Sequence, residues 1–289
     1  MKMKLSVLTA SLLAASLFSH SSYVSAKIPF WGAESGQEMP SLAPMLEKVT
    51  PAVVNINVAG NREVRQRMPD AFQQFFGQGE LRREQPFRGL GSGVIIDAKK
   101  GYVVTNHHVI SKLPDESKNE RYVVLSGHGS DPVVHPILSK KSDSIHDLAV
   151  LKIAATLPAL RLANNEPTPE GTALAFTGYP ITGVLGLYPA THRATLSAVT
   201  PIAIPHDNSK SLNPVTLRQL QQPFMVYQLD GTAYPGNSGS ALYRTEDGVV
   251  VAIINMVLVK GSREAVLSDP SGIAYAIPVV HLHQLLSQP

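Results

Sequence analysis

The 289-residue sequence contains no cysteine. This absence excludes a disulfide-stapled scaffold, a thiolate nucleophile, a zinc site with cysteine ligands and lipid attachment through an N-terminal cysteine. An exported protein can use disulfides but does not need them, so the absence does not decide the compartment. The fold must be held together by packing, and a hydrophobic content of 44% is enough for a sizeable core.

Long apolar runs are also scarce. The one at residues 5–18 follows a short basic start and precedes Val24-Ser25-Ala26, which fits a small-residue cleavage site. This is the three-part pattern of a secretory signal peptide. The run is shorter than the roughly 20 apolar residues of a membrane span, although an uncleaved anchor is the alternative. We predict a signal peptide over residues 1–26, a periplasmic or secreted protein, and no stable membrane insertion after cleavage.

Charged residues make up only 16% of the chain, and the formal net charge is +3. Removal of residues 1–26 takes away Lys2 and Lys4 and lowers that charge to +1. A nearly neutral protein lacks the basic surface that nucleic acid or acidic lipid attracts. We therefore expect no nucleic-acid partner.

Short β-rich segments recur along the chain and are mostly bounded by Gly, Pro, Asp, Asn or Ser. They lie at residues 52–59, 94–97, 102–105, 122–125, 148–153, 173–176, 194–199, 224–229, 249–254 and 273–276. Many short strands without regular helices between them favour an all-β barrel or sandwich. Short helices are predicted only at residues 41–49, with Ser41 as the N-cap, and at residues 278–288.

Three long stretches, at residues 61–88, 201–223 and 259–270, lack this rhythm and are predicted to be loops. Residues 160–170 contain two prolines and two asparagines and are the best boundary between two β-rich halves. The predicted organisation is an extended segment over 27–40, a first β-barrel over 41–163, a second over 164–277, and a C-terminal helix and tail over 278–289.

Ser238 lies in a Gly-Asn-Ser-Gly turn, and this turn has two interpretations. Gly, Asn and Ser are ordinary turn residues because they tolerate unusual backbone angles. A nucleophilic serine would also need a base, an acid that orients the base, and N–H donors for an oxyanion. A strand at residues 102–105 runs into a turn with His107 and His108, and Asp147 precedes the apolar strand 148–153. Each segment alone has a structural reading, but the order His, Asp, Ser is that of the chymotrypsin-type triad.

A linked set of motifs carries a family resemblance. The set comprises SLAPMLEKVTPAVVNINV at 41–58, GLGSGVIID at 89–97, TNHHV at 105–109, HDLAV at 146–150, GYP at 178–180, PGNSG at 235–239 and GIAYAIP at 272–278. Together these segments resemble the protease domain of the high-temperature-requirement (HtrA/Deg) periplasmic serine proteases. The resemblance covers most of residues 41–280 and is closest before residue 110.

The resemblance implies two chymotrypsin-like six-stranded β-barrels with the active site in the cleft between them. In the family pattern Thr-Asn-x-His-Val, the catalytic histidine is His108, and His107 occupies the variable position. Asp147 matches the orienting acid and Ser238 the nucleophile. The oxyanion hole would use the backbone N–H groups of Gly236 and Ser238, with Asn237 shaping the loop between them. No metal or organic cofactor is expected.

Substrate preference is expected to depend on Thr232, six residues before the nucleophile. Since this residue is not acidic, we do not expect a preference for Lys or Arg. Four apolar residues are predicted to form part of the pocket wall: Ala252, Ile253, Ile254 and Met256. The resemblance implies cleavage after small or medium aliphatic residues in unfolded or damaged proteins.

The sequence departs from the family pattern in several places. Ser240 replaces the last glycine of Gly-Asn-Ser-Gly-Gly, the pocket loop 230–236 is altered, and 201–223 is longer than the corresponding family loop. The chain ends at Pro289, before the PDZ domains of such proteins, so PDZ-dependent capture is not supported. Aromatic residues in 27–39 and in 61–88 resemble family contacts of a homotrimer. The rival reading is a weakly active or inactive protease-like binding protein, such as a holdase or regulator.

Overall fold

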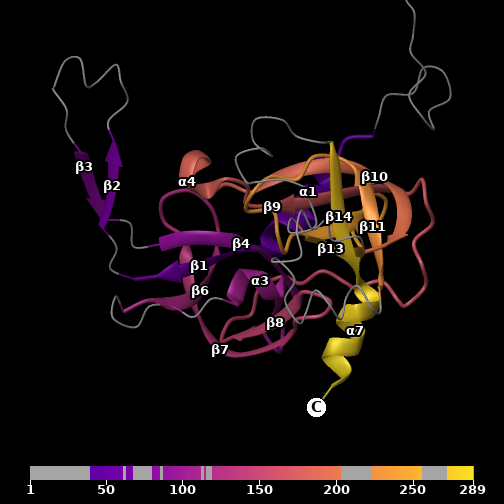
Figure 1. Cartoon of the computed structure of the whole chain (residues 1–289), viewed down its shortest axis with the longest axis horizontal. Coiled ribbons are helices and arrows are strands. Elements are labelled where there is room, and N and C mark those ends of the chain that lie inside the picture. Colours follow the sequence, from indigo (N-terminus) through magenta and orange to yellow (C-terminus); the bar gives the residue numbers. More distant parts are fainter. Residues whose placement is uncertain are drawn as a thin grey trace, which may run out of the picture. The chain divides into compact units, whose positions relative to one another are not determined.

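The computed structural model describes residues 40–60, 63–67, 80–84, 87–111, 114, 119–202, 223–255 and 272–288. The chain divides into two units, Met1–Ser41 and Leu42–Pro289. The predicted signal peptide and nearly all of the extended segment 27–40 lie outside the described residues, so both stay predictions. The fold of the second unit is shown in Figure 1.

Six antiparallel strands close into the first barrel, in the order β1-β4-β5-β8-β7-β6. They are β1 (Val53–Ala59), β4 (Phe87–Asp97), β5 (Tyr102–Thr105), β6 (Arg121–Ser126), β7 (Val133–Asp143) and β8 (Leu148–Ile153). In β1 the apolar residues alternate with Asn55 and Asn57, yet both asparagines are also buried. Asn55 donates from Nδ2 to the Gly91 carbonyl at 2.8 Å and accepts a bond from Asn57, so the buried amides are paired.

Six further antiparallel strands close into the second barrel, in the order β10-β11-β14-β13-β12-β9. They are β9 (Ala173–Gly178), β10 (Ala190–Pro201), β11 (Met225–Asp230), β12 (Ala241–Arg244), β13 (Val250–Asn255) and β14 (Ile273–Pro278). All six residues of β13 are buried. The prediction of an all-β fold with two six-stranded barrels is therefore confirmed. The predicted boundary between residues 163 and 164 lies in the connection from β8 to β9 and stays a prediction.

The C-terminal helix α7 (Val279–Ser287) follows β14 without a break (Figure 1). It packs against β13 and β14 of the second barrel and against β7 and β8 of the first. Its buried residues Val279, Leu282 and Leu285 recur every three positions and form the packed face. The helix predicted here is confirmed. Among the described residues, none of the helices has the length and apolar character needed to cross a membrane.

Several local predictions were wrong. Helix α1 (Ala43–Val49) has Leu42, not Ser41, as its N-cap, without a side-chain capping bond; Pro44 lies in its first turn, where proline favours helix initiation. A 3-10 turn, η1 (Thr50–Ala52), follows it.

Within the predicted loop 61–88, the strands β2 (Glu63–Arg67) and β3 (Glu80–Glu84) pair antiparallel. Their sequences, EVRQR and ELRRE, contain too few apolar residues for an alternating strand signal.

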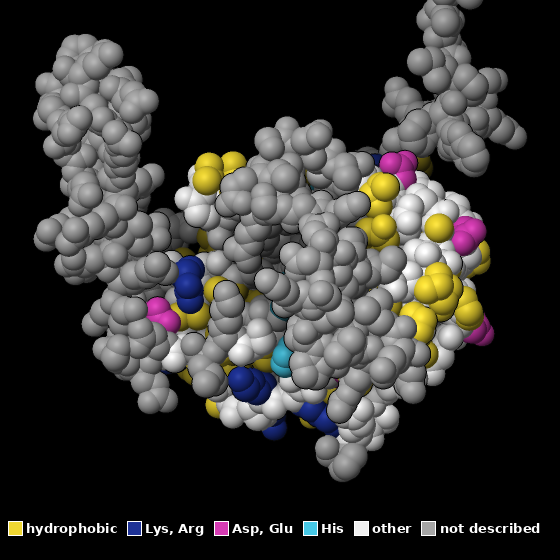
Figure 2. All heavy atoms as spheres, viewed as in Figure 1, with side chains coloured by type: hydrophobic (Ala, Val, Ile, Leu, Met, Phe, Trp, Pro, Cys, Tyr) yellow, Lys and Arg dark blue, Asp and Glu magenta, His cyan; other side chains and the backbone are white. Residues whose placement is uncertain are grey.

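Two single-turn helices, α3 (His107–Ile110) and α4 (Thr182–Leu185), were not predicted. Hydrophobic side chains are visible on the surface over α4 in Figure 2, where Val184 and Leu185 are exposed. Ile181, the N-cap of α4, has a φ of 46°. A left-handed backbone is unfavourable for a β-branched residue, so the entry to α4 is strained.

Candidate active site

His108 is held by the short segment between β5 and the end of α3. Asn106 has an extended backbone and begins α3, and the buried Val109 and Ile110 anchor that helix in the core. The Asn106 side chain donates to the Asp147 carbonyl at 3.0 Å. The His108 side chain is 28% exposed, so its ring lies at the edge of the first barrel and can reach a second element.

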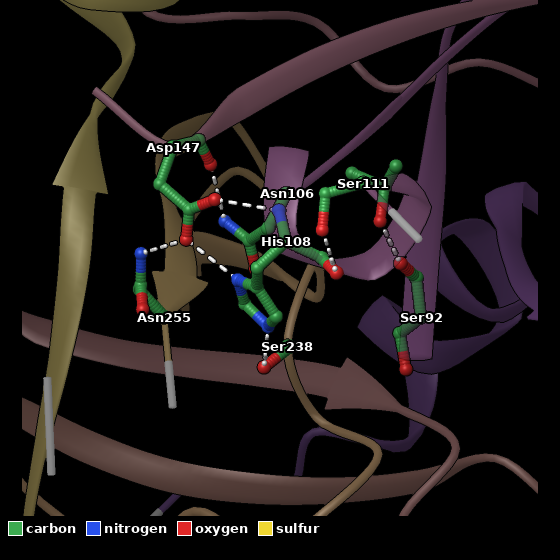
Figure 3. Close-up of polar contacts among 8 residues, drawn as sticks. Ser92, Asn106, His108, Ser111, Asp147, Ser238 and Asn255 are labelled. Atoms are coloured by element: carbon green, nitrogen blue, oxygen red, sulfur yellow. Dashed lines mark hydrogen bonds and ion pairs between the residues drawn. The ribbon is translucent and has the colours of Figure 1, made fainter. Parts of the chain in front are cut away.

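Asp147 lies in the turn between β7 and β8 and has a φ of 52°. Asp is one of the few residues that adopt this left-handed conformation readily. Its Oδ1 accepts the backbone N–H of His108 at 2.7 Å, and its Oδ2 lies 2.6 Å from His108 Nδ1. Asn255, the last residue of β13, donates from Nδ2 to the same Oδ2 at 2.7 Å. The carboxylate therefore fixes both the backbone and the ring of His108 (Figure 3).

Ser238 comes from the second barrel, in the turn between β11 and β12. Its Oγ lies 3.0 Å from His108 Nε2, on the side of the ring opposite Asp147 (Figure 3). The structure therefore brings together all three residues of the sequence-derived triad, two from the first barrel and one from the second. A hydroxyl at this distance from an imidazole nitrogen is within reach of general-base catalysis.

The backbone around Ser238 is held through most of its peptide groups. The bonds within the second barrel run from Ile181 N to Pro235 O at 2.7 Å, from Asn237 N to Tyr234 O at 2.9 Å, from Ser240 N to Asn237 O at 2.9 Å and from Gly239 N to Ile254 O at 3.0 Å. The N–H groups of Gly236 and Ser238 have no partner among the described residues. Gly236 has a φ of 102°, a conformation that favours glycine. Two free N–H groups beside a candidate nucleophile are the arrangement that an oxyanion hole requires.

The predicted pocket residues are only partly described. Thr232 is half-buried after β11, and Met256 lies outside the described residues. Ala252, Ile253 and Ile254 are fully buried in the apolar core of the second barrel. Ile254 contributes its backbone, since its N–H donates to Ser240 O at 2.9 Å. The role of these residues in a substrate pocket stays a prediction.

Ser240, where the chain departs from the family pattern, is fully buried beneath the loop. Its hydroxyl and both polar atoms of the Asn237 side chain have no partner among the described residues. A Cβ added to Gly178 would lie 1.9 Å from Ser240 Oγ. The serine therefore occupies the space that Gly178 leaves open.

Asp143, His146 and His281 form a separate cluster beside the candidate triad, and His146 directly precedes Asp147 in the chain. His146 Nδ1 contacts Asp143 Oδ2 at 2.5 Å, and its ring stacks on His281 of α7 at 4.0 Å. Burial acts to raise the pKa of Asp143, but the hydrogen bonds from His146 outweigh it and hold the value at about 2. Burial lowers the pKa of His281, and the nearby His146 adds to this effect.

His281 and His283 lie two positions apart on α7, a spacing that would leave two histidines at the surface on different faces of a helix. Both are instead half-buried. The ring of His281 packs on His146, while His283 Nε2 lies 2.7 Å from the Ala163 carbonyl. The described residues contain no group of three or more potential metal-ligating side chains.

Comparisons with known proteins agree with this geometry. Residues 91–253 match the trypsin-like peptidase domain. The chain is 32% identical to the periplasmic serine endoprotease DegP of Salmonella typhimurium, in an alignment that covers 89% of this chain and 52% of DegP. It is also 32% identical to the periplasmic pH-dependent serine endoprotease DegQ of Escherichia coli, with coverage of 96% and 54%. The chain thus spans about half the length of the curated relatives it matches.

A solved structure shows the same relationship. The HtrA-type protease AlgW, solved with a decapeptide, has a TM-score of 0.57 and 26% sequence identity, over 86% of this chain and 67% of that one. The two-barrel fold agrees with the family match, which extends across both barrels, and with the names of these relatives. The chain belongs to the trypsin-like peptidase family and is of the HtrA/Deg type.

Proposed function

We propose that this chain is an exported serine endopeptidase that cleaves unfolded or damaged proteins through an acyl-enzyme. The observation that carries the proposal is the continuous line of contacts from Asp147 Oδ2 to His108 Nδ1 at 2.6 Å and from His108 Nε2 to Ser238 Oγ at 3.0 Å. These contacts support a proposal in which Asp147 is the acid, His108 the base and Ser238 the nucleophile of an acyl transfer.

Acylation begins when Ser238 Oγ attacks the carbonyl carbon of the scissile peptide and His108 Nε2 takes the hydroxyl proton. Asp147 keeps the Nδ1 proton on the imidazole and stabilises the imidazolium. The negative oxygen of the tetrahedral intermediate accepts bonds from the N–H groups of Gly236 and Ser238. The C–N bond then breaks, His108 gives its proton to the leaving amine, and the acyl group stays as an ester on Ser238.

Deacylation repeats these steps with water. His108 takes a proton from water as the water oxygen attacks the ester carbonyl, and the same two N–H groups accept the new oxyanion. When the ester bond breaks, the proton on His108 returns to Ser238 Oγ. The products are a peptide with a new carboxylate and the free enzyme.

Substrate class and location are supported by the relatives. DegP and DegQ are named as periplasmic endoproteases, and AlgW was solved with a decapeptide. We infer extended polypeptide substrates and a periplasmic location, which agree with the signal peptide predicted from the sequence. Thr232 supplies no negative charge, so cleavage after aliphatic residues is preferred to cleavage after Lys or Arg. Apart from Phe87, which begins β4, the aromatic residues that suggested a homotrimer lie outside the described residues, and the trimer stays a prediction.

The decisive experiment combines a fluorophosphonate probe with unfolded casein. The wild-type protein without residues 1–26 should become labelled on Ser238 and should degrade casein. Ser238→Ala should do neither. Ser126→Ala, which removes a buried hydroxyl that contacts His135 Nε2 at 2.7 Å in the first barrel, is the matched control and should behave like the wild type.

The outcomes separate the two readings of the sequence. If the wild type neither reacts with the probe nor cleaves casein at any temperature or pH tested, the protein is not an active protease. The alternative interpretation, a protease-like binding protein, then replaces the proposal. Labelling without casein cleavage would retain the nucleophile and reject broad cleavage of unfolded proteins.

A further inference from the structure

Ser92 connects the first barrel to the loop that carries the candidate nucleophile. It lies in β4 and is fully buried. Its backbone N–H donates to the Ser238 carbonyl at 2.7 Å. Its Oγ donates to the Gly236 carbonyl, also at 2.7 Å, and accepts the Tyr179 N–H at 2.8 Å. One residue of the first barrel therefore holds the carbonyls of both residues whose N–H groups are proposed to bind the oxyanion.

Ser92 is itself held in place by neighbouring backbone and side chains. Its carbonyl accepts a bond from Thr105 Oγ1 at 2.7 Å. Thr105 ends β5, the strand that leads to His108. A Cβ added to Gly239 would lie 2.1 Å from the Ser92 carbonyl oxygen, so the nucleophile loop packs directly on this residue. The position of Ser92 is thus set by the same strand that positions the base.

The bond from Ser92 Oγ to the Gly236 carbonyl acts on a rotatable part of the loop. This carbonyl belongs to the peptide group between Gly236 and Asn237, which lies between the two peptide groups that carry the free N–H donors. Glycine restricts backbone rotation least of all residues. Without the bond from Ser92 Oγ, the part-buried Gly236 carbonyl would lose this donor. The bond from the Asn237 N–H to the Tyr234 carbonyl at 2.9 Å would be left to resist a rotation of the same peptide group. Such a rotation would turn the two N–H groups away from a common point.

We propose that Ser92 is a positioning residue, whose hydroxyl holds the Gly236–Asn237 peptide group so that the N–H groups of Gly236 and Ser238 converge on the oxyanion. The inference rests on the proposed serine-protease function. Ser92 touches neither the substrate nor the reacting atoms, and it acts through the loop alone. The side-chain contacts between His108, Asp147 and Ser238 do not involve it.

The test compares Ser92→Ala with Ser126→Ala, which also loses a buried hydroxyl but lies away from the loop. A misplacement of about 1 Å in a catalytic group can cost roughly 100-fold in rate, so kcat of Ser92→Ala on a peptide substrate should fall about 10- to 100-fold. KM should change less than about twofold, because an interaction made only in the transition state is lost. Affinity for a peptide aldehyde, whose adduct with Ser238 carries an oxyanion, should fall by the same factor as kcat/KM.

A merely structural role for Ser92 would give a different result. In that case the unfolding temperature would fall in both variants, while kcat and the aldehyde affinity of folded Ser92→Ala would match those of Ser126→Ala, which overturns the inference. The pH at which kcat reaches half its maximum should not move in Ser92→Ala, since the contacts of His108 are unchanged. A shift of that midpoint would also overturn the inference, because it would place the effect on the base.

A second variant carries the test if Ser92→Ala does not fold. Thr105→Val keeps the side-chain volume but removes the bond to the Ser92 carbonyl. We expect a smaller fall in kcat, about threefold to tenfold, again with KM unchanged. An unchanged kcat in this variant would overturn the inference. Failure of the wild type to label or cleave would instead reject the proposed function and this inference with it, whereas an active wild type with an unaffected Ser92→Ala rejects the inference alone.

Discussion

Asp147 binds His108 at two places, with one carboxylate oxygen 2.7 Å from the backbone nitrogen and the other 2.6 Å from ring Nδ1. The backbone bond fixes which oxygen faces which group. The His108 backbone therefore orients the Asp147 carboxylate, and that carboxylate orients the His108 ring. Because each group fixes the other, the effect of substituting Asp147 can be predicted.

Asp147→Asn should lower kcat by about 10⁴-fold, as expected for the loss of the correct imidazole tautomer. The amide oxygen can still accept the His108 backbone N–H, which leaves the NH2 group facing Nδ1. Nδ1 must then act as the acceptor, so the proton lies on Nε2 and this atom cannot take one from Ser238. The measurement is kcat on a peptide substrate. Asp143→Asn, four residues away, should retain activity; a similar loss in both variants would contradict this role for Asp147.

Asn255→Ala should lower kcat about tenfold. It removes the Nδ2 donor 2.7 Å from Asp147 Oδ2, and a bond to a charged group contributes about 1.5–3 kcal/mol. The carboxylate then has one restraint fewer. Steady-state kinetics with a peptide substrate would measure the change, and Asn57→Ala provides a control in which a buried amide away from the site is lost. Wild-type kcat in Asn255→Ala would show that the His108 contacts alone hold Asp147.

Gly178→Ala should destabilise the fold by about 1–3 kcal/mol, the usual cost of overpacking a core. The new methyl group would lie 1.9 Å from Ser240 Oγ and 2.7 Å from Ser92 Oγ. Ser240→Gly removes the nearer atom, so the double variant should recover part of the loss. Urea unfolding of both single variants and the double variant closes the thermodynamic cycle. Simple additivity of the two free energies would show that the residues do not compete for this space.

Ile181→Asn should stabilise the protein by about 1 kcal/mol. A β-branched residue pays a steric cost in the left-handed region, which Asn tolerates better. The bond to the Pro235 carbonyl comes from the backbone N–H of residue 181 and is retained. Thermal unfolding would measure the gain, and kcat should stay near the wild-type value. A lower unfolding temperature would indicate that the packing of the Ile181 side chain outweighs the backbone strain.

Asp143 should make the fold sensitive to acid. Its pKa of about 2 lies below the ordinary value of 3.8, so the unfolded chain takes up the proton first. Its contribution to stability is fully present above pH 4 and is lost as the pH falls from about 4 towards 2. Urea unfolding between pH 6 and pH 2 should show a shallower decline for Asp143→Asn than for the wild type. Equal slopes would contradict the assignment of the low pKa to this residue.

The sequence predicts strands best where both faces are buried. The segments predicted at residues 102–105 and 148–153 have the same bounds in the structure, because their β-branched and aliphatic residues are bounded by polar turns. Strand β7 was missed because it is mostly exposed and contains Pro136 and a run of Lys. An exposed strand obtains its stability from pairing with β6 and β8, and a linear pattern does not contain that information.

Some residues of the candidate site could also be predicted from the sequence, and others could not. His108, Asp147 and Ser238 were found because their motifs occur in a characteristic order. Asn255 had a weak signal, as a polar residue at the end of an apolar strand. Ser92 had none, since its bonds go to backbone carbonyls more than 140 positions away in the chain. Such bonds depend on how two barrels meet, which local patterns do not specify.

Helix α7 contacts strands of both barrels and follows His108, Asp147 and Ser238 in the chain. The segment that bears His108 and Asp147 emerges from the ribosome well before Ser238, and the bridging helix emerges later still. Assembly of the three side chains therefore depends on residues that appear after all of them. A nascent chain would carry these three side chains without their final geometry, and its own unfolded segments would be spared during synthesis.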